Sequence, residues 1–336
     1  MNHKIHFGII GFGHIGTRHA KCILDHPKAH LSAICDISNQ VKLKCEDIYK
    51  SIFCSYDDLI LNQSIDVVNI CTPNYLHANM AIDVLRAGKH VVIEKPMALS
   101  SLDAQKIIDT SKSEKRLVFC VMQNRFSPSI IWLKEIILKQ KLGQINMVSI
   151  NCFWNRNENY YLDSNWHGSC QKDGGPLFTQ FSHFIDILYW LFGSVKTAHS
   201  EFFSFNKKDF IEFEDSGIVQ LKFTNNLVGV LNYSTAIWNK NFESSITIIG
   251  EKGTVKIGGQ YMDKIIYCDI QDYTLPSIEV NTTCNDYGDY KGSASNHDKM
   301  IDNVINVLLE KQEIHTNALD GLNVVSIIEQ IYNHRK

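Results

Sequence analysis

The sequence predicts an α/β protein with a doubly wound parallel sheet in its N-terminal part and an α+β domain with an open, mainly antiparallel sheet in its C-terminal part. Short apolar runs alternate with amphipathic ones as far as Met122, a glycine-rich turn follows the first run, and strands separated by turn residues dominate after Lys141. Strand–helix alternation is typical of parallel sheets, and successive strands are typical of antiparallel ones. In this chain of 336 residues we expect two domains, residues 1–124 and 125–336.

The strands of the first domain are indicated by near-continuous apolar runs at residues 5–10, 31–35, 65–71, 90–93 and 117–122. Amphipathic segments between them predict helices at residues 15–24, 75–87 and 101–115. A ligand of such a sheet binds at the carboxyl ends of its strands, so the loops that leave those ends should carry the functional side chains.

The second domain should begin with a long strand at residues 145–154 and a helix at residues 175–192. Further strands are predicted at residues 215–223, 228–234, 245–249 and 254–257, with hairpin turns at 225–226 and 251–253. Helices at residues 297–309 and 319–333 follow. Because a broad apolar face of this sheet suits burial against another copy, we expect a homodimer or homotetramer.

A glycine-rich turn, Gly-Phe-Gly-His-Ile-Gly, follows the first strand. Gly11 allows the tight turn, Gly13 lets the backbone approach a pyrophosphate, and Gly16 permits close packing of helix on strand. Asp36 stands twenty positions beyond Gly16, at the end of the second strand, where it can accept hydrogen bonds from a ribose diol. A carboxylate repels a ribose phosphate, and no arginine follows it, so the turn predicts NAD rather than NADP.

The overall composition restricts the partners and the compartment. A net charge of −3 and a pI near 6.5 give no basic field, so nucleic acid is not an expected partner. The first apolar run is too short for a signal peptide and no run suits a membrane span, which favours a cytoplasmic protein. The ten cysteines form no C-x-x-C pair, so we expect reduced core thiols and no metal site.

Polar side chains leave the strands expected at residues 65–71, 90–93 and 117–122, where they would meet at one edge of the sheet. They are Thr72 and Asn74, then Lys95, then Gln123, Asn124 and Arg125. A lysine that ends a buried strand at this edge is a candidate catalytic cation, although a lysine before a proline is also compatible with an ordinary surface position.

A second polar group is expected on the helix at residues 175–192. Thr179, His183 and Asp186 would lie near one face of it, because residues three and four apart are neighbours on a helix. His183 is a candidate general base, and a hydrogen-bonded core histidine is the alternative. Asp186 is equally compatible with a local cap or ion pair.

These motifs together resemble the Gfo/Idh/MocA family of NAD(P)-dependent sugar dehydrogenases, over nearly the whole chain. The resemblance is carried by the glycine turn, Thr72-Pro73-Asn74 with His77, Glu94-Lys95-Pro96, Gln123-Asn124-Arg125, Asp173-Gly174-Gly175 and His183. It implies contacts to the cofactor from Gly11, Gly13, His14, Ile15, Gly16, Asp36, Thr72, Asn74, His77, Glu94, Lys95, Gln123 and Trp166.

Within that family the chain is similar to bacterial dehydrogenases that oxidise the 3-hydroxyl of UDP-N-acetylglucosamine or its uronic acid for surface polysaccharide synthesis. The similarity rests on Phe153-Trp154-Asn155-Arg156 with Tyr160-Tyr161, on Trp166 and Gly168, and on residues 241–255. It implies substrate contacts from Lys95, Arg156, Tyr160, Thr179, His183 and His297. The chain departs from the pattern at Thr179, where an Asp or Asn is usual, at His167, which replaces an Arg, and at Cys170, which replaces a Trp.

The mechanism implied by the resemblance divides the work between a cation and a base. His183, with an ordinary pKa of about 6.5, would accept the hydroxyl proton while Lys95, with an ordinary pKa of about 10.4, positions the oxygen. The two roles could also be shared. Two alternatives remain open: an inositol or simple aldose dehydrogenase, and a non-catalytic NAD-binding regulator, since a fold does not fix an activity.

Overall fold

The computed structural model describes residues 4–49, 52–206, 208–278, 284–286 and 291–333. The chain forms two compact units, one of residues 1–122 with 297–325 and the other of residues 123–296 with 326–336. The expected division at residues 124/125 therefore lies close to the first crossing between the units. The expectation differs at the other end, because residues 297–325 return to the first unit instead of remaining in the second.

The first unit is built on a five-stranded parallel sheet of order β2-β1-β3-β4-β5. Its strands are β1 (Ile5–Ile10), β2 (Ala29–Cys35), β3 (Val67–Ile70), β4 (His90–Ile93) and β5 (Val118–Cys120). The strands predicted at residues 65–71, 90–93 and 117–122 thus correspond to β3, β4 and β5, and the loops with the polar side chains follow them. Between β2 and β3, Phe53 makes only an isolated parallel bridge to Ile34.

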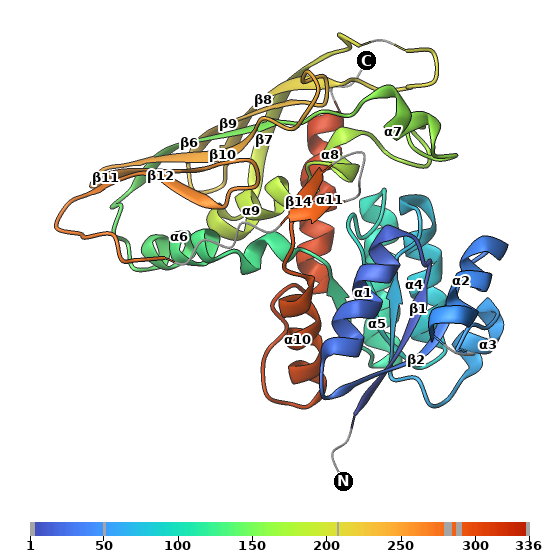
Figure 1. Cartoon of the computed structure of the whole chain (residues 1–336). Coiled ribbons are helices and arrows are strands. Elements are labelled where there is room, and N and C mark those ends of the chain that lie inside the picture. The colour runs from blue at the N-terminus through green and yellow to red at the C-terminus, as the bar shows by residue number, and fades with distance from the viewer. Residues whose placement is uncertain (1–3, 50–51, 207, 279–283, 287–290, 334–336) are drawn as a thin grey trace. The chain divides into compact units, whose positions relative to one another are not determined.

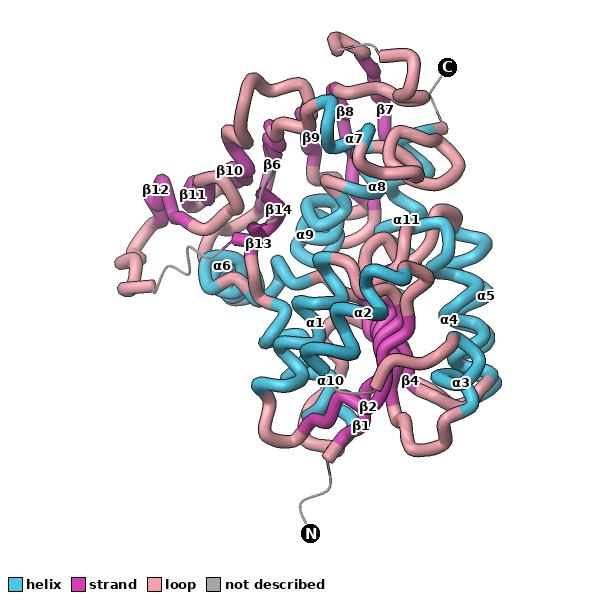
Figure 2. The backbone as a smooth tube through the Cα atoms, turned by 45° about the vertical axis from the view of Figure 1, so that its right-hand side comes forward, coloured by secondary structure: helices cyan, strands magenta, loops and turns pink. Residues whose placement is uncertain are grey.

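Helices cover both faces of this sheet, α1 and α10 on one side and α4 and α5 on the other (Figure 2). The helical segments are α1 (His14–Asp25), α2 (Asn39–Tyr49), α3 (Tyr56–Leu61), η1 (Asn74–Leu76), α4 (His77–Arg86), α5 (Ser101–Glu114) and α10 (His297–Leu308). Burial on both faces explains the continuous apolar strands, since every residue of β3 is fully buried. The Ser100 side chain accepts the Asp103 N–H at 3.1 Å and so begins α5.

The second unit is built on a seven-stranded sheet of order β12-β11-β10-β6-β9-β8-β7 (Figure 1). Its strands are β6 (Ile145–Phe153), β7 (Val195–Phe203), β8 (Ser216–Phe223), β9 (Val228–Ser234), β10 (Glu243–Gly250), β11 (Gly253–Gly258) and β12 (Lys264–Ile270). All neighbours are antiparallel except β6 and β9, which confirms a mainly antiparallel sheet. β13 (Cys284–Asp286) and β14 (Lys291–Ala294) form a separate pair.

The helical segments of the second unit are η2 (Gln123–Phe126), α6 (Pro128–Leu138), α7 (Glu158–Leu162), α8 (Pro176–Thr179) and α9 (Ser182–Phe192), and α11 (Ala318–Tyr332) has residues in both units. Helices α8 and α9 are two consecutive pieces where the sequence predicted one helix. Helix α9 is apolar on nearly all sides and is buried, with Phe184, Ile185 and Ile187 inaccessible to solvent.

Among the described residues, no helix combines the length and apolar character that a bilayer crossing requires. The nine cysteines with described side chains are free thiols.

Candidate functional site

The glycine turn between β1 and α1 has a separate geometric reason for each glycine. Gly11 has a φ of +86°, and a Cβ there would lie 2.7 Å from the Cys71 carbonyl oxygen. A Cβ on Gly16 would lie 2.1 Å from the Gly11 oxygen, so helix and turn touch at this point. A Cβ on Gly13 would meet no described atom within 4 Å. Gly11 and Gly16 therefore serve the packing of the turn, whereas Gly13 keeps open the side from which a ligand approaches.

Asp36 is joined to the same turn. Its Oδ2 accepts the Phe12 N–H at 2.6 Å and its Oδ1 accepts the Ser38 N–H at 2.8 Å. A carboxylate oxygen can accept more than one hydrogen bond, so both oxygens retain acceptor capacity for a diol. These bonds fix the carboxylate at the end of β2, next to the glycine turn.

The start of α1 suits an anion. Gly13 precedes the helix and provides no capping side chain, and residues 14–17 of the first turn carry no acidic group. The exposed His14 and half-buried Ile15 begin the helix. Backbone N–H groups at a helix N-terminus attract phosphate. The turn, the helix start and Asp36 thus fit the pyrophosphate and adenosine ribose of NAD.

The loop after β3 is tied to the segment after β4 by a buried imidazole. The ring of His77 has Nδ1 at 2.7 Å from the Pro96 oxygen and Nε2 at 2.8 Å from the Thr72 oxygen. Burial lowers the pKa of His77, while the hydrogen bonds to the two backbone oxygens act in the opposite direction. His77 therefore holds two loops at the ligand edge through their backbones, while Thr72 lies half-buried and Asn74 buried on the same loop.

Lys95 lies half-buried directly after β4, and Glu94 before it is buried. The Lys95 N–H donates to its neighbour's Oε2 at 3.2 Å. Burial raises the pKa of Glu94, but the hydrogen bond from His19 and the neighbouring imidazole of His297 outweigh it and hold that pKa well below the usual range. Glu94 is therefore a carboxylate, and it is bonded within the protein.

In the second unit, η2 and α9 bring an amide against the candidate base. Gln123 Nε2 lies 3.3 Å from His183 Nε2, and both side chains are buried. Because an amide N–H can only donate, His183 Nε2 is the acceptor, so this nitrogen carries the lone pair that can take a proton. The backbone oxygen of Gln123 accepts in turn from Asn296 Nδ2 at 3.3 Å.

A buried ion pair joins the same two segments. Arg125 Nε donates to Asp186 Oδ2 at 2.9 Å and its NH2 group to Oδ1 at 2.5 Å, with both side chains almost inaccessible to solvent. This two-pronged geometry fixes both position and angle. Because Asp186 is one turn from His183 on α9 and Arg125 is two residues from Gln123, the pair keeps the imidazole opposite the amide.

The expectation that Thr179 shares a helix face with His183 is wrong, because the helix is interrupted. The chain leaves α8 at Thr179 and re-enters a helix at Ser182, with Phe181 as the residue before α9. The Thr179 hydroxyl hydrogen-bonds the side chain of Asp173 and also its backbone oxygen at 3.0 Å. Asp173 also accepts the Gly168 N–H at 2.9 Å, so Thr179 belongs to a buried loop network.

Aromatic and cationic groups form a column near α7. The Arg156 guanidinium lies 5.0 Å from the Trp154 ring centre and 5.2 Å from that of Tyr160. On the other side, Tyr160 stacks on His167 at 4.2 Å with an angle of 15° between the rings, and Trp166 lies 3.9 Å from His167. Arg156 is only 8% exposed, so most of its surface is committed to this column instead of to solvent.

His297 is placed in the first unit, at the start of α10. It is 2% exposed and its Nε2 lies 3.6 Å from Glu94 Oε1. The structure therefore brings it beside Glu94, in the interior of the first unit. His19 and Asn69 complete this interior group and were not expected. Their only signal was a polar side chain within an otherwise apolar helix face and strand.

Comparisons with known proteins agree with this geometry. Residues 5–122 match the family described as "Oxidoreductase family, NAD-binding Rossmann fold", and residues 130–256 match the GFO/IDH/MocA C-terminal domain. The WlbA dehydrogenase of Bordetella pertussis, solved with NADH and UDP-GlcNAcA, is 31% identical, with 98% of this chain and 95% of that one covered and a TM-score of 0.89. The WlbA dehydrogenase of Chromobacterium violaceum, solved with the same two ligands, is 30% identical, with 98% and 93% covered and a TM-score of 0.88. An inositol 2-dehydrogenase of Salmonella typhimurium is 30% identical over 55% of this chain and 53% of its own length.

Proposed function

The chain belongs to the Gfo/Idh/MocA family of oxidoreductases and is an NAD-dependent enzyme; on this premise we propose that it oxidises the 3-hydroxyl of a UDP-linked N-acetylated hexose or hexuronic acid to the 3-keto sugar. The observation that carries the proposal is the near-full-length similarity to a dehydrogenase whose structure holds NADH and UDP-GlcNAcA. UDP-N-acetylglucosaminuronate is the slightly preferred substrate, and surface polysaccharide synthesis is the corresponding cellular role.

The chain's own residues would divide the chemistry as follows. NAD, when bound, supplies the hydride acceptor. His183, whose ring is held against the Gln123 amide, accepts the proton of the sugar hydroxyl. Lys95 donates a hydrogen bond to the same oxygen and stabilises its developing negative charge.

The nucleotide-sugar part of the proposal depends on the aromatic column. The half-buried Trp166 and His167 offer flat surfaces for stacking, while the buried Tyr160 supports His167 and Arg156 adds a permanent charge within the column. His167 stands where related dehydrogenases carry an arginine, so the permanent positive charge of that arginine is absent from this chain. If that cation offsets a sugar carboxylate, UDP-N-acetylglucosamine should be used at least as well as its uronic acid; if it serves the cofactor, the uronic acid should remain preferred.

The roles of Lys95 and His183 are tested by replacing each with Ala and measuring NADH formation. Each variant should retain NAD binding and lose turnover, typically by ~10²–10⁴-fold for loss of a general base. Lys106→Ala and His199→Ala are matched controls, since both residues are exposed and lie outside the site. Near-normal turnover in His183→Ala would assign the proton to Lys95 or to another group.

One competing substrate class has its own support. The similarity to an inositol 2-dehydrogenase, although limited to about half of each chain, is compatible with a free polyol or simple sugar as substrate. A substrate panel separates the two, because a nucleotide-sugar enzyme loses activity when the UDP moiety is removed.

We also propose that the open face of the seven-stranded sheet forms a contact between copies of the chain. Met147 pairs with Ile249 on one neighbouring strand and with Val228 on the other, so the three side chains lie on one face, 42–44% exposed. Exposed apolar clusters of this kind mark association sites. Light scattering should give a dimer or tetramer, and Met147→Glu should reduce its mass; a monomeric wild-type protein would contradict this proposal.

A further inference from the structure

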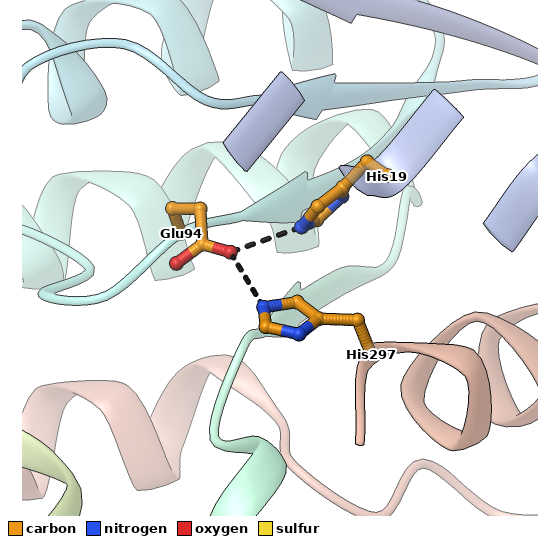
Figure 3. A group of neighbouring side chains, drawn as sticks. All are labelled: His19, Glu94 and His297. Atoms are coloured by element: carbon orange, nitrogen blue, oxygen red, sulfur yellow. Dashed lines mark hydrogen bonds and ion pairs between the residues drawn. The ribbon is translucent and has the colours of Figure 1, made fainter. Parts of the chain in front are cut away.

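Two histidines and a glutamate from three distant segments meet in the interior of the first unit (Figure 3). His19 is on α1, Glu94 follows β4 and His297 begins α10, and all three are at most 6% exposed. Both imidazoles face the same carboxylate oxygen, Oε1, with His19 Nε2 at 2.9 Å and His297 Nε2 at 3.6 Å. Burying charged or polar groups costs free energy unless they are paired or hydrogen-bonded.

The hydrogen-bond pattern assigns the protons. Asn69 Nδ2 lies 2.7 Å from His19 Nδ1 and donates to it, so the proton of the His19 ring is on Nε2 and points at Glu94. Burial lowers the pKa of His297, in spite of its carboxylate neighbour, which favours a neutral ring. Glu94 is therefore the negatively charged member of the group.

This arrangement suits a hydrogen-bonded network better than a metal site. A structural zinc site has four protein ligands, and a catalytic one has three with an open position for water. Among the described residues the cluster has three members, and it lies in the interior. Moreover, His19 directs a proton at the carboxylate, where a metal ligand would direct a lone pair.

The second oxygen of the carboxylate connects the cluster to Lys95. Glu94 Oε2 accepts the Lys95 N–H at 3.2 Å, while Oε1 is occupied by the imidazoles. The carboxylate is thus held on one side and holds the backbone of the lysine on the other. Beyond Lys95, the Pro96 oxygen is held by the ring of His77.

We propose that His19, Glu94 and His297 form a positioning network for Lys95, an inference that rests on the proposed catalytic role of the lysine. The two imidazoles fix the carboxylate, and the carboxylate fixes the end of β4 from which the lysine side chain extends. The negative charge next to the lysine also favours its protonated form, in which it donates to the substrate oxygen.

The electrostatic part of this proposal takes account of all the groups around Glu94. Titratable or charged side chains act on the network from several elements. Arg18 and His19 lie on α1, Cys71 follows β3, His77 lies on α4, Lys95 follows β4 and His297 begins α10. Burial raises the pKa of the Cys71 thiol well above its usual value, so the thiol stays uncharged. Glu94, which directly precedes Lys95 in the chain, therefore carries the negative charge of this group.

The test compares Glu94→Gln, which keeps the shape and removes the charge, with a pair of variants at His297. His297→Gln retains an N–H donor near the place of Nε2, and His297→Leu removes it. We expect kcat to fall about 10–100-fold in Glu94→Gln and His297→Leu and to be largely restored in His297→Gln, with the sugar KM changing less than about threefold. Thr316→Val is the matched control, because it removes another buried hydrogen bond of this unit, to the Cys120 oxygen, without touching the network.

A second measurement needs no substrate. After reductive methylation with ¹³C-formaldehyde, the Lys95 signal, assigned by its absence in Lys95→Arg, reports the titration of the amine by NMR. In Glu94→Gln it should titrate about 0.5–1 pH unit lower than in the wild type, as expected when one nearby charge is removed at a partly solvated site; Thr316→Val should not move it.

These two readouts separate failure of the network from failure of the proposed function. Absence of NADH formation with every UDP-sugar would refute the function, and the NMR titration would still report on the network. An unchanged Lys95 titration in Glu94→Gln, together with unchanged turnover in any active wild-type assay, overturns the network. One equivalent of zinc in the purified protein, lost in His297→Leu, would also overturn it by identifying a metal site.

Discussion

Two single-methyl substitutions in the glycine turn should separate folding from cofactor binding. In Gly16→Ala the new Cβ would lie 2.1 Å from the Gly11 oxygen, so backbone must move by more than 1 Å to restore an ordinary contact. Overpacking of this kind costs about 1–3 kcal/mol of the free energy of unfolding. In Gly13→Ala the Cβ meets no described atom within 4 Å, and the φ of −72° is one that alanine adopts readily.

The stability of Gly13→Ala should therefore stay within about 0.5 kcal/mol of the wild type, since a small capping loss opposes the gain from a less flexible unfolded chain. Its affinity for NAD should fall at least about tenfold, or 1.4 kcal/mol, because the methyl group occupies the side from which the pyrophosphate approaches. Denaturant unfolding without NAD and calorimetric titration with NAD measure the two effects. Unchanged NAD affinity in a stably folded Gly13→Ala variant would refute the assignment of the turn.

Other substitutions test other parts of the account. Asp36→Ala should narrow the preference for NAD over NADP, and calorimetry showing tighter NADP binding to the unmodified protein would contradict the role of this carboxylate. Asp186→Ala should lower the free energy of unfolding by about 3–5 kcal/mol, because it leaves the Arg125 guanidinium buried without its carboxylate. Arg125→Met combined with Asp186→Leu should recover much of that loss. Equal losses of stability in the single and double variants would argue against a buried ion pair as the cause. Burial lowers the pKa of His90 to about 4, so the folded state resists its protonation, and the free energy of unfolding should fall by up to about 3 kcal/mol as pH decreases from about 6.5 to 4. His90→Asn, which retains an acceptor for the Leu117 N–H, should make that pH dependence shallower, and an identical slope would exclude His90 as its source.

The sequence predicted those parts of the fold in which local pattern and burial agree. β1, β4 and β9 have the predicted bounds because each is an apolar or alternating run enclosed by clear turn signals. β7 and β12 were not predicted: β7 has a largely exposed, polar pattern, and β12 is an edge strand with most side chains partly exposed. The pairing of β6 with β9, the parallel pair in this sheet, joins segments about eighty residues apart, and no local pattern encodes it.

The candidate site shows the same division between local and long-range information. The glycine turn, Asp36 and Lys95 lie where the sequence placed them, because each follows directly from a strand end. Helical periodicity does not reveal the interruption between α8 and α9, where Thr179, the last residue of α8, hydrogen-bonds the side chain of Asp173. The position of His297 depends on the return of α10 to the first unit, a contact across more than two hundred residues with Glu94.

We propose that this enzyme oxidises the 3-hydroxyl of a UDP-linked N-acetylated sugar with NAD. This proposal is tested most directly by incubating the protein with NAD and a panel of UDP-N-acetylglucosaminuronate, UDP-N-acetylglucosamine, free inositol and glucose, following NADH absorbance and locating the oxidised carbon by NMR. The account predicts NADH formation with a UDP-sugar, a keto carbon at position 3, and loss of both in Lys95→Ala and His183→Ala. Robust turnover of inositol or glucose with neither UDP-sugar active would contradict it.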